Sequence, residues 1–220
     1  MELLYQDSSL WVAVKPPELL SEMGDAEHSF AARLAAENKG YVGVVHRLDR
    51  GVGGVMVYAK TAEAAARLSL AVQSRQVQKE YLAVVHGCPE CREAELCDLL
   101  FHDRNVNKTY VVDRERRGVK KAILSYRVQE TVEDAELGRL SLLRVTLQTG
   151  RTHQIRAQLS HAGHSLLGDR KYGSPAKAPI ALFSCRLAFV HPMKKGTMDF
   201  SHTPQSGIWD RFSTLKGTER

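Results

Sequence analysis

One acid between two arginines is the part of this sequence best suited to chemistry. The run His46-Arg47-Leu48-Asp49-Arg50 lies between two short apolar runs, 44–45 and 55–58, and glycines follow it. Apolar β-branched runs interrupted by glycines predict a strand, a loop and a second strand. Because nearby cations favour the ionised form of a carboxylate, Asp49 is a candidate nucleophile toward an anionic substrate. A solvated ion-pair patch is the alternative that these residues alone leave open.

The same stretch resembles the signature of the RluA-type pseudouridine synthases. The resemblance rests on His46-Arg47-Leu48-Asp49, followed by Gly54 and by Ala59-Lys60. In that family the sole catalytic acid stands at the position of Asp49. Three further blocks extend the resemblance along the chain, in the family's order.

The first of these further blocks lies before the middle of the sequence, and the other two lie in its second half. The first is Lys79-Glu80-Tyr81-Leu82-Ala83, which is similar to the family's Lys-x-Tyr-x-Ala strand. The second is Gly150-Arg151-Thr152-His153-Gln154-Ile155-Arg156, which closes at residues 168–173. The third is the apolar run 182–189, followed by His191-Pro192. Together the four blocks cover nearly the whole chain.

The resemblance implies both a fold and a reaction. We expect an α+β fold: one pseudouridine-synthase domain over residues 1–220, with a mixed, mainly antiparallel sheet flanked by helices and a central RNA-binding cleft. No separate N-terminal RNA-binding domain is expected, because the first strand begins at Leu3. The reaction breaks the N-glycosidic bond of a uridine in ribosomal or transfer RNA, rotates the base and rejoins it through carbon. Neither a cofactor nor a metal is expected.

The resemblance also implies roles for individual residues. Asp49 adds to the base, attacks the anomeric carbon or removes a sugar proton, and the sequence does not choose among these. Tyr81 stacks on the target base, and Arg156 pairs with Asp49, a bidentate task that suits arginine better than lysine. Without the resemblance, an ordinary half-buried strand tyrosine is the favoured interpretation of Tyr81. The remaining contacts expected with a flipped uridine and its phosphates are Arg47, Arg50, Lys79, Arg151, His153 and Gln154.

The sequence departs from the family pattern in the loop itself. Val52-Gly53 stands where family members usually have Thr-Ser, so a pair of hydroxyl groups is missing. Gln158 replaces a common histidine, and Ser165 replaces a common proline. The altered loop leaves open a second hypothesis, in which the protein is an RNA-binding relative without catalysis that acts as a chaperone or assembly factor.

Composition is compatible with an RNA partner. The chain has 31 Lys and Arg against 25 Asp and Glu, a formal net charge of +6, which suits a polyanion without requiring one. No signal peptide is evident, and no apolar run approaches the ~20 residues of a membrane span. We therefore expect a cytoplasmic monomer with reduced thiols.

A polar segment in the middle of the chain permits two alternatives. Residues 88–121 form either a basic rim that binds the RNA backbone or a charged, mobile insertion. Cys88 and Cys91 have the spacing of a metal-binding pair, which Cys97 and His102 could complete as a zinc site. Free thiols in a turn are the simpler interpretation.

The hydrophobic pattern predicts the elements that must position these residues. Thr61 is expected to cap a helix that runs to about Ser74, and Thr152 a helix that ends at Gly163. Ile155, Leu159 and Ala162 should lie on the buried face of that second helix. A further helix is expected within 26–38, and strands at 3–7, 10–15, 79–87, 122–128, 140–147 and 182–189, with the acidic loop 130–136 joining a hairpin.

Overall fold

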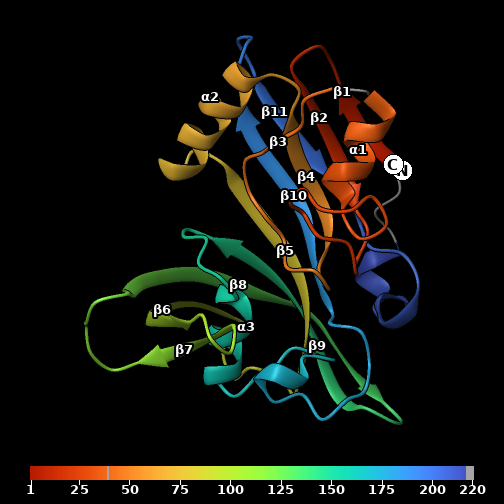
Figure 1. Cartoon of the computed structure of the whole chain (residues 1–220). Coiled ribbons are helices and arrows are strands. Elements are labelled where there is room, and N and C mark those ends of the chain that lie inside the picture. Colours follow the sequence, from red (N-terminus) through yellow and green to blue (C-terminus); the bar gives the residue numbers. More distant parts are fainter. Residues whose placement is uncertain (39, 217–220) are drawn as a thin grey trace. The chain divides into compact units, whose positions relative to one another are not determined.

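The computed structural model describes residues 1–38 and 40–216, and the chain divides into two compact units. Unit 1 comprises residues 1–79 and 183–204, and unit 2 comprises residues 80–182 and those from 205 onwards. The chain enters unit 2 within strand β5 (Gln78–His86) and returns to unit 1 within strand β10 (Leu182–Val190). Each unit combines a sheet with α-helix (Figure 1), so the predicted α+β class is confirmed.

Unit 1 contains a mixed sheet. Its order is β1, β2, β4, β10. The pairs β1–β2 and β2–β4 are antiparallel, whereas β4 and β10 are parallel. Strand β3 pairs with β4, and β11 pairs antiparallel with β10. The bounds are β1 (Glu2–Gln6), β2 (Leu10–Lys15), β3 (Gly43–Val44), β4 (Gly53–Ala59) and β11 (Thr197–Ser201).

Helices cover both faces of strand β4. Val57 belongs to the apolar cluster that includes Leu68 of helix α2 (Ala62–Gln73). Tyr58, the next residue of the strand, contacts Phe30 of helix α1 (Phe30–Asn38), and their ring centroids lie 5.9 Å apart. Because successive strand residues point to opposite faces, α1 and α2 pack on opposite sides of β4.

The two helices of unit 1 begin where polar side chains cap them. Thr61 Oγ accepts a hydrogen bond from the backbone N–H of Ala64 at 3.1 Å, which confirms the predicted cap of α2. Helix α1 begins later than residue 26, because Asp25 first closes a turn by accepting from the N–H of His28 at 3.0 Å. Ser29 then caps the helix by accepting from the N–H of Ala32.

Unit 2 contains an antiparallel sheet in the order β5, β9, β8, β6, β7. The predicted strands within 79–87, 122–128 and 140–147 are confirmed, although β8 and β9 are longer and leave a shorter turn than 130–136. Residues 88–121 are not a mobile insertion, because strands β6 and β7 occupy much of that range (Figure 1). The bounds are β6 (Glu93–Asp103), β7 (Lys108–Val112), β8 (Val119–Asp134) and β9 (Gly138–Leu147).

Helix α3 (Gln154–His161) packs on the sheet of unit 2. Ile155 and Leu159 are buried as predicted, whereas Ala162 is exposed at the C-cap. The predicted cap at Thr152 is wrong: the N-cap is His153, with φ of 52° and no side-chain capping bond. The amide of Gln158 donates to Asp98 Oδ2 at 2.7 Å, which ties the helix to β6.

The two short 3₁₀ helices at the end of the described chain are Gly207–Arg211 and Ser213–Leu215, and a third spans Arg170–Tyr172. Among the described residues, no helix is both long and apolar enough to cross a membrane. One catalytic domain over residues 1–220, with a central cleft and no separate RNA-binding domain, stays a prediction.

Candidate active site

Asp49 lies on the loop between β3 and β4, entirely within unit 1. The N–H of Val52 donates to the carbonyl of Asp49 at 2.9 Å and closes the turn. Val52 packs its side chain in the interior, whereas Asp49 is only partly buried. At Gly54 the φ angle is 128°, and a Cβ there would lie 2.3 Å from the carbonyl oxygen of Ser184. A glycine is therefore required where the loop enters the sheet beside β10.

The segment from residue 16 to residue 22 holds this loop. Ser21 Oγ donates to the carbonyl of Leu48 at 2.9 Å and accepts from the N–H of the same residue at 3.0 Å. On the other side of Asp49, the carbonyl of Arg50 accepts from the N–H of Glu18 at 2.8 Å. This segment could not be predicted, because nothing in its composition indicates which loop it contacts.

Lys15 is a second contact that the sequence did not reveal. Its side chain is fully buried, and Nζ donates to the carbonyls of Leu19 at 2.7 Å, Pro16 at 2.9 Å and Arg50 at 3.3 Å. Burial lowers the pKa of Lys15 to about 8, against the opposing effect of nearby negative charges that include Asp49. A buried ammonium therefore lies near the candidate catalytic carboxylate.

The two arginines that flank Asp49 in sequence form ion pairs with that same segment. Arg47 pairs with Glu22 at 2.8 Å, and Arg50 approaches Glu18 at 3.8 Å. All four side chains are substantially exposed. Exposed pairs of this kind contribute about 0–1 kcal/mol, so either guanidinium can exchange its carboxylate for a phosphate at low cost.

His46 and Lys79 are the other titratable groups near this loop. His46 is buried, and its Nε2 accepts from the N–H of Val57 at 3.2 Å. Burial, together with the charge of Lys79, lowers the pKa of His46 well below its ordinary value, so the ring is neutral. Burial also lowers the pKa of Lys79 to about 8. Lys79 is consequently a cation that titrates near neutral pH.

Unit 2 carries Tyr81 and Arg156. Tyr81 is buried on β5, opposite Val145 of β9. Arg156 forms a bidentate ion pair with Asp169, from Nε to Oδ2 at 2.7 Å and from Nη2 to Oδ1 at 2.9 Å. The guanidinium also lies 4.9 Å from the ring centroid of Tyr172. The predicted pairing of Arg156 with Asp49 joins residues of different units and stays a prediction.

The neighbours of Arg156 in the third sequence block are tied into unit 2. Nδ1 of His153 lies 3.0 Å from the hydroxyl of Tyr172, which also accepts from the N–H of Thr109 at 2.7 Å. Gln154 is buried, and its amide oxygen accepts from the N–H of Arg151 at 3.0 Å. These bonds give His153 and Gln154 a structural role in fixing the start of α3.

A groove of about 460 Å³ opens on the sheet of unit 2. Two ion pairs lie along it, Arg144–Glu80 at 2.9 Å and Arg127–Glu93 at 2.7 Å. None of the predicted site residues lines this groove. Its lining residues are Glu80, Glu93, Ala94, Ser125, Tyr126, Arg127, Arg144 and Thr146.

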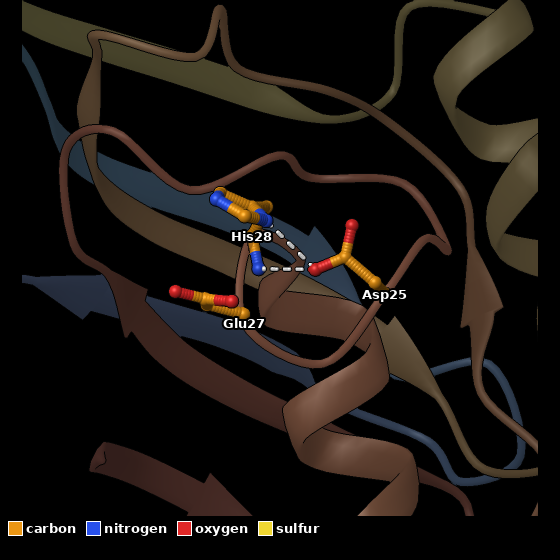
Figure 2. Close-up of side chains that lie close together, drawn as sticks. All are labelled: Asp25, Glu27 and His28. Atoms are coloured by element: carbon orange, nitrogen blue, oxygen red, sulfur yellow. Dashed lines mark hydrogen bonds and ion pairs between the residues drawn. The ribbon is translucent and has the colours of Figure 1, made fainter.

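The zinc alternative gains no support from the described residues. Cys88, Cys91 and Cys97 are free and exposed, and none of them joins a group of three or more potential ligands. The group that does come together is Asp25, Glu27 and His28, shown in Figure 2. All three are exposed, and His28 Nδ1 lies 2.8 Å from Asp25 Oδ1. This cluster forms the turn before α1, which accounts for its geometry without a metal.

Comparison with known proteins adds independent information. A family model described as RNA pseudouridylate synthase matches residues 9–161. A ribosomal large subunit pseudouridine synthase D of Zymomonas mobilis subsp. mobilis is 31% identical over 222 residues, covering 91% of this chain and 68% of that protein. Its counterpart of the same name from Xylella fastidiosa is 33% identical over 205 residues, covering 89% of this chain and 58% of that protein.

Solved structures share the fold. Human RNA pseudouridylate synthase domain containing 1 has a TM-score of 0.76 at 19% identity, over 99% of this chain and 95% of that one. Human RNA pseudouridylate synthase domain containing 4 has a TM-score of 0.73 at 22% identity, over 91% and 87% of the two chains. At these identities the likeness concerns the fold alone.

Proposed function

Because the chain belongs to the RNA pseudouridylate synthase family, we propose that it isomerises uridines of ribosomal RNA, with Asp49 as its catalytic group. The family model spans Asp49, Tyr81 and Arg156. The choice of ribosomal RNA follows the names of the two bacterial relatives, which are large-subunit enzymes. A cytoplasmic, monomeric enzyme is part of the same proposal.

The observation that carries this proposal is the placement of Asp49. Its carboxylate is partly exposed on a tight loop, while the residues on both sides of it are held by hydrogen bonds from the segment 16–22. A nucleophile or base works only if it is held in a reactive position. The loop provides that rigidity and leaves Asp49 partly exposed.

The proposed reaction is an isomerisation in which a base takes the C5 proton and an acid protonates N1. The bond from N1 of the uracil to C1′ of the ribose breaks, the base rotates, and C5 bonds to C1′ in its place. The C5 proton leaves and N1 ends protonated, so the product is an isomer of the substrate. Asp49 acts by attack on C1′, by addition to the base or by removal of a sugar proton.

Tyr81 and Arg156 are proposed to complete the site. Tyr81 presents an aromatic ring on which the flipped uracil can stack. Arg156 is proposed to pair with Asp49 and keep it ionised. What supports this role is its rigidity, since the bidentate pair with Asp169 fixes the guanidinium plane.

Binding of RNA is proposed to use cations around the Asp49 loop and at the start of α3. Arg47 and Arg50 hold exposed, exchangeable ion pairs, and Lys79 is a partly buried cation at the start of β5. Arg151 donates through Nε to the carbonyl of Lys121 at 3.2 Å, which places it beside a second basic residue. His153 and Gln154 are proposed to contact the substrate from the same turn.

The test is a comparison of the parent protein with Asp49→Asn. Each is incubated with transcribed large-subunit ribosomal RNA or with transcribed transfer RNA, and nuclease digests are analysed for pseudouridine by chromatography and chemical labelling. We expect pseudouridine in ribosomal RNA with the parent and none with Asp49→Asn, while RNA affinity changes by no more than about threefold. Turnover near the parent rate in the variant would remove Asp49 from the catalytic role.

The assay also separates the proposal from its alternatives. Pseudouridine in transfer RNA alone would keep the reaction and change the substrate. Tight RNA binding without pseudouridine in either RNA would favour the chaperone hypothesis raised by Val52-Gly53.

A further inference from the structure

The main chain on both sides of Asp49 is fixed by side chains that lie outside the loop. Val52 and Gly53 bring no hydroxyl group to the loop, and Val52 is buried among apolar residues. The polar side-chain contacts to Leu48 and Arg50 come instead from Ser21 and Lys15. We propose that Ser21 and Lys15 are positioning residues that hold Asp49 in its reactive orientation. This inference rests on the proposed function.

Ser21 acts on the residue immediately before Asp49. Its hydroxyl donates to the carbonyl of Leu48 and accepts from the N–H of Leu48, so both polar groups of that residue are satisfied by one side chain. Ser21 is fully buried, and its own carbonyl accepts from the hydroxyl of Tyr58 at 3.3 Å. A continuous chain of hydrogen bonds therefore connects the loop to the core strand β4.

Lys15 acts on the residue immediately after Asp49. An ammonium has three donors, and Lys15 directs them to three carbonyls, one of which belongs to Arg50. A buried charge adds little to the stability of the fold, because burial opposes ionisation. An apolar side chain of similar volume often stabilises the fold equally well. Its bond to the carbonyl of Arg50 and its placement near Asp49 therefore favour a positioning role for the ammonium.

The geometry can be tested without RNA. Ser21→Ala leaves the N–H of Leu48 without its acceptor, so amide hydrogen exchange should become faster in peptides that contain residues 46–52. Ser141→Ala is the matched control: Ser141 lies in unit 2, is also fully buried, donates to the carbonyl of Gly87 at 2.8 Å and lies 3.0 Å from the hydroxyl of Thr131. Ser141→Ala should leave exchange in residues 46–52 unchanged.

Kinetics on the RNA that the parent protein modifies distinguish positioning from general stability. A misplaced reacting group costs about 10²-fold in rate, so Ser21→Ala should lower kcat by about that factor, with KM within about threefold. Ser21→Thr keeps the hydroxyl and should recover most of the rate. Lys15→Met removes the contact to Arg50 and should likewise lower kcat while KM stays within about threefold. This variant tests the inference independently if Ser21→Ala does not fold.

The results that overturn the inference differ from those that overturn the proposed function. If the parent protein forms no pseudouridine, the proposed function fails, whereas the hydrogen-exchange result still reports on the loop. If the parent is active and both Ser21→Ala and Lys15→Met keep its kcat, the positioning role is wrong. Equal losses of kcat in Ser21→Ala and Ser141→Ala would also overturn it, because a buried serine with no bond to the loop or to segment 16–22 would then have the same effect.

Discussion

Two arginines of this protein make similar bidentate pairs in different surroundings. Arg156 and Asp169 have side chains only 13% and 1% exposed, whereas those of Arg186 and Asp199 are 31% and 48% exposed. Removing one member of a buried pair leaves an uncompensated charge, which typically costs ~3–5 kcal/mol. We expect Arg156→Ala to lower the free energy of unfolding by that amount in urea denaturation. Arg156→Lys should recover only part of it, because an ammonium does not reproduce the planar fork.

Arg186→Ala is the control for this prediction. It removes a bidentate ion pair of similar geometry from a more exposed position, where the expected loss of unfolding free energy is about 0–1 kcal/mol. Equal losses from Arg156→Ala and Arg186→Ala would show that burial of the Arg156–Asp169 pair does not set its contribution.

Lys79 gives a prediction about pH. Burial lowers its pKa to about 8, so its positive charge is present at pH 7 and is lost as the pH rises through 8. If Lys79 contacts a phosphate, RNA affinity should fall over that range, well below the pH at which an exposed lysine loses its proton. In Lys79→Arg, binding measured by fluorescence anisotropy between pH 6.5 and 9.5 should not show this decrease. A decrease of the same size in the variant would assign it to another group.

Among elements, the C-terminal 3₁₀ helix is held by a single carboxylate of β8. Burial opposes ionisation of Glu130, but bonds from the N–H and hydroxyl groups of Ser213 and Thr214 outweigh it and lower its pKa to about 2. Because the folded-state pKa is depressed from 4.5, the stabilisation is present above pH 4.5 and is lost as the pH falls toward 2. The urea midpoints of the parent and Glu130→Ala should therefore differ most at pH 6, differ less at pH 3 and converge only near pH 2.

The control for this prediction is Glu133→Ala. Glu133 lies on the same strand and pairs with Arg139 rather than with the C-terminal segment. Trypsin should cleave Glu130→Ala near Arg211 faster than it cleaves Glu133→Ala. Equal cleavage rates would mean that Glu130 does not hold this segment.

The elements that sequence predicted well are those with a local signal. Helix α2 has an apolar face, and Thr61 stands where its hydroxyl can accept a hydrogen bond from the backbone N–H of Ala64. The first residue of this helix can therefore be predicted from the sequence. Helix α3 also follows a threonine, but Thr152 instead accepts through its carbonyl from the hydroxyl of Thr109 at 2.8 Å. That contact spans two distant segments, and no local pattern indicates it.

Strands β6 and β7 were missed for a different reason. Most residues of β6 are exposed or only partly buried, so the alternation of apolar and polar residues is weak. Its pairing with β7 and β8 depends on backbone hydrogen bonds, which leave little trace in the side-chain sequence.

At the scale of the whole molecule, the excess of basic residues predicts salt-sensitive binding. Four contacts to single-stranded phosphates, from Arg47, Arg50, Lys79 and Arg151, alone give a slope of about −3 in a plot of log affinity against log salt concentration. Arg47→Ala should reduce the magnitude of that slope by about 0.7. A flat plot would show that the basic residues do not form the RNA-binding surface.

Much of the candidate site followed from motifs, but its supports did not. Asp49, Tyr81 and Arg156 each stand in a recognisable sequence block. Ser21, Lys15 and Asp169 act through bonds to residues that are distant in sequence or through backbone atoms that any residue has. Charge and spacing indicate which groups can react, whereas the tertiary fold decides what holds them.

The approach of Gly54 to Ser184 has a consequence for synthesis of the chain. Residues 1–79 leave the ribosome first, but β10, which pairs with β4, is made only after all of residues 80–182. The sheet that supports Asp49 is therefore incomplete on a growing chain, whereas the contiguous part of unit 2 can fold earlier. In pulse proteolysis, a fragment of residues 1–182 should leave residues 1–79 cleavable, and the full chain should protect them. Protection in the fragment would contradict this order. Otherwise the enzyme becomes competent only after β10 has been synthesised.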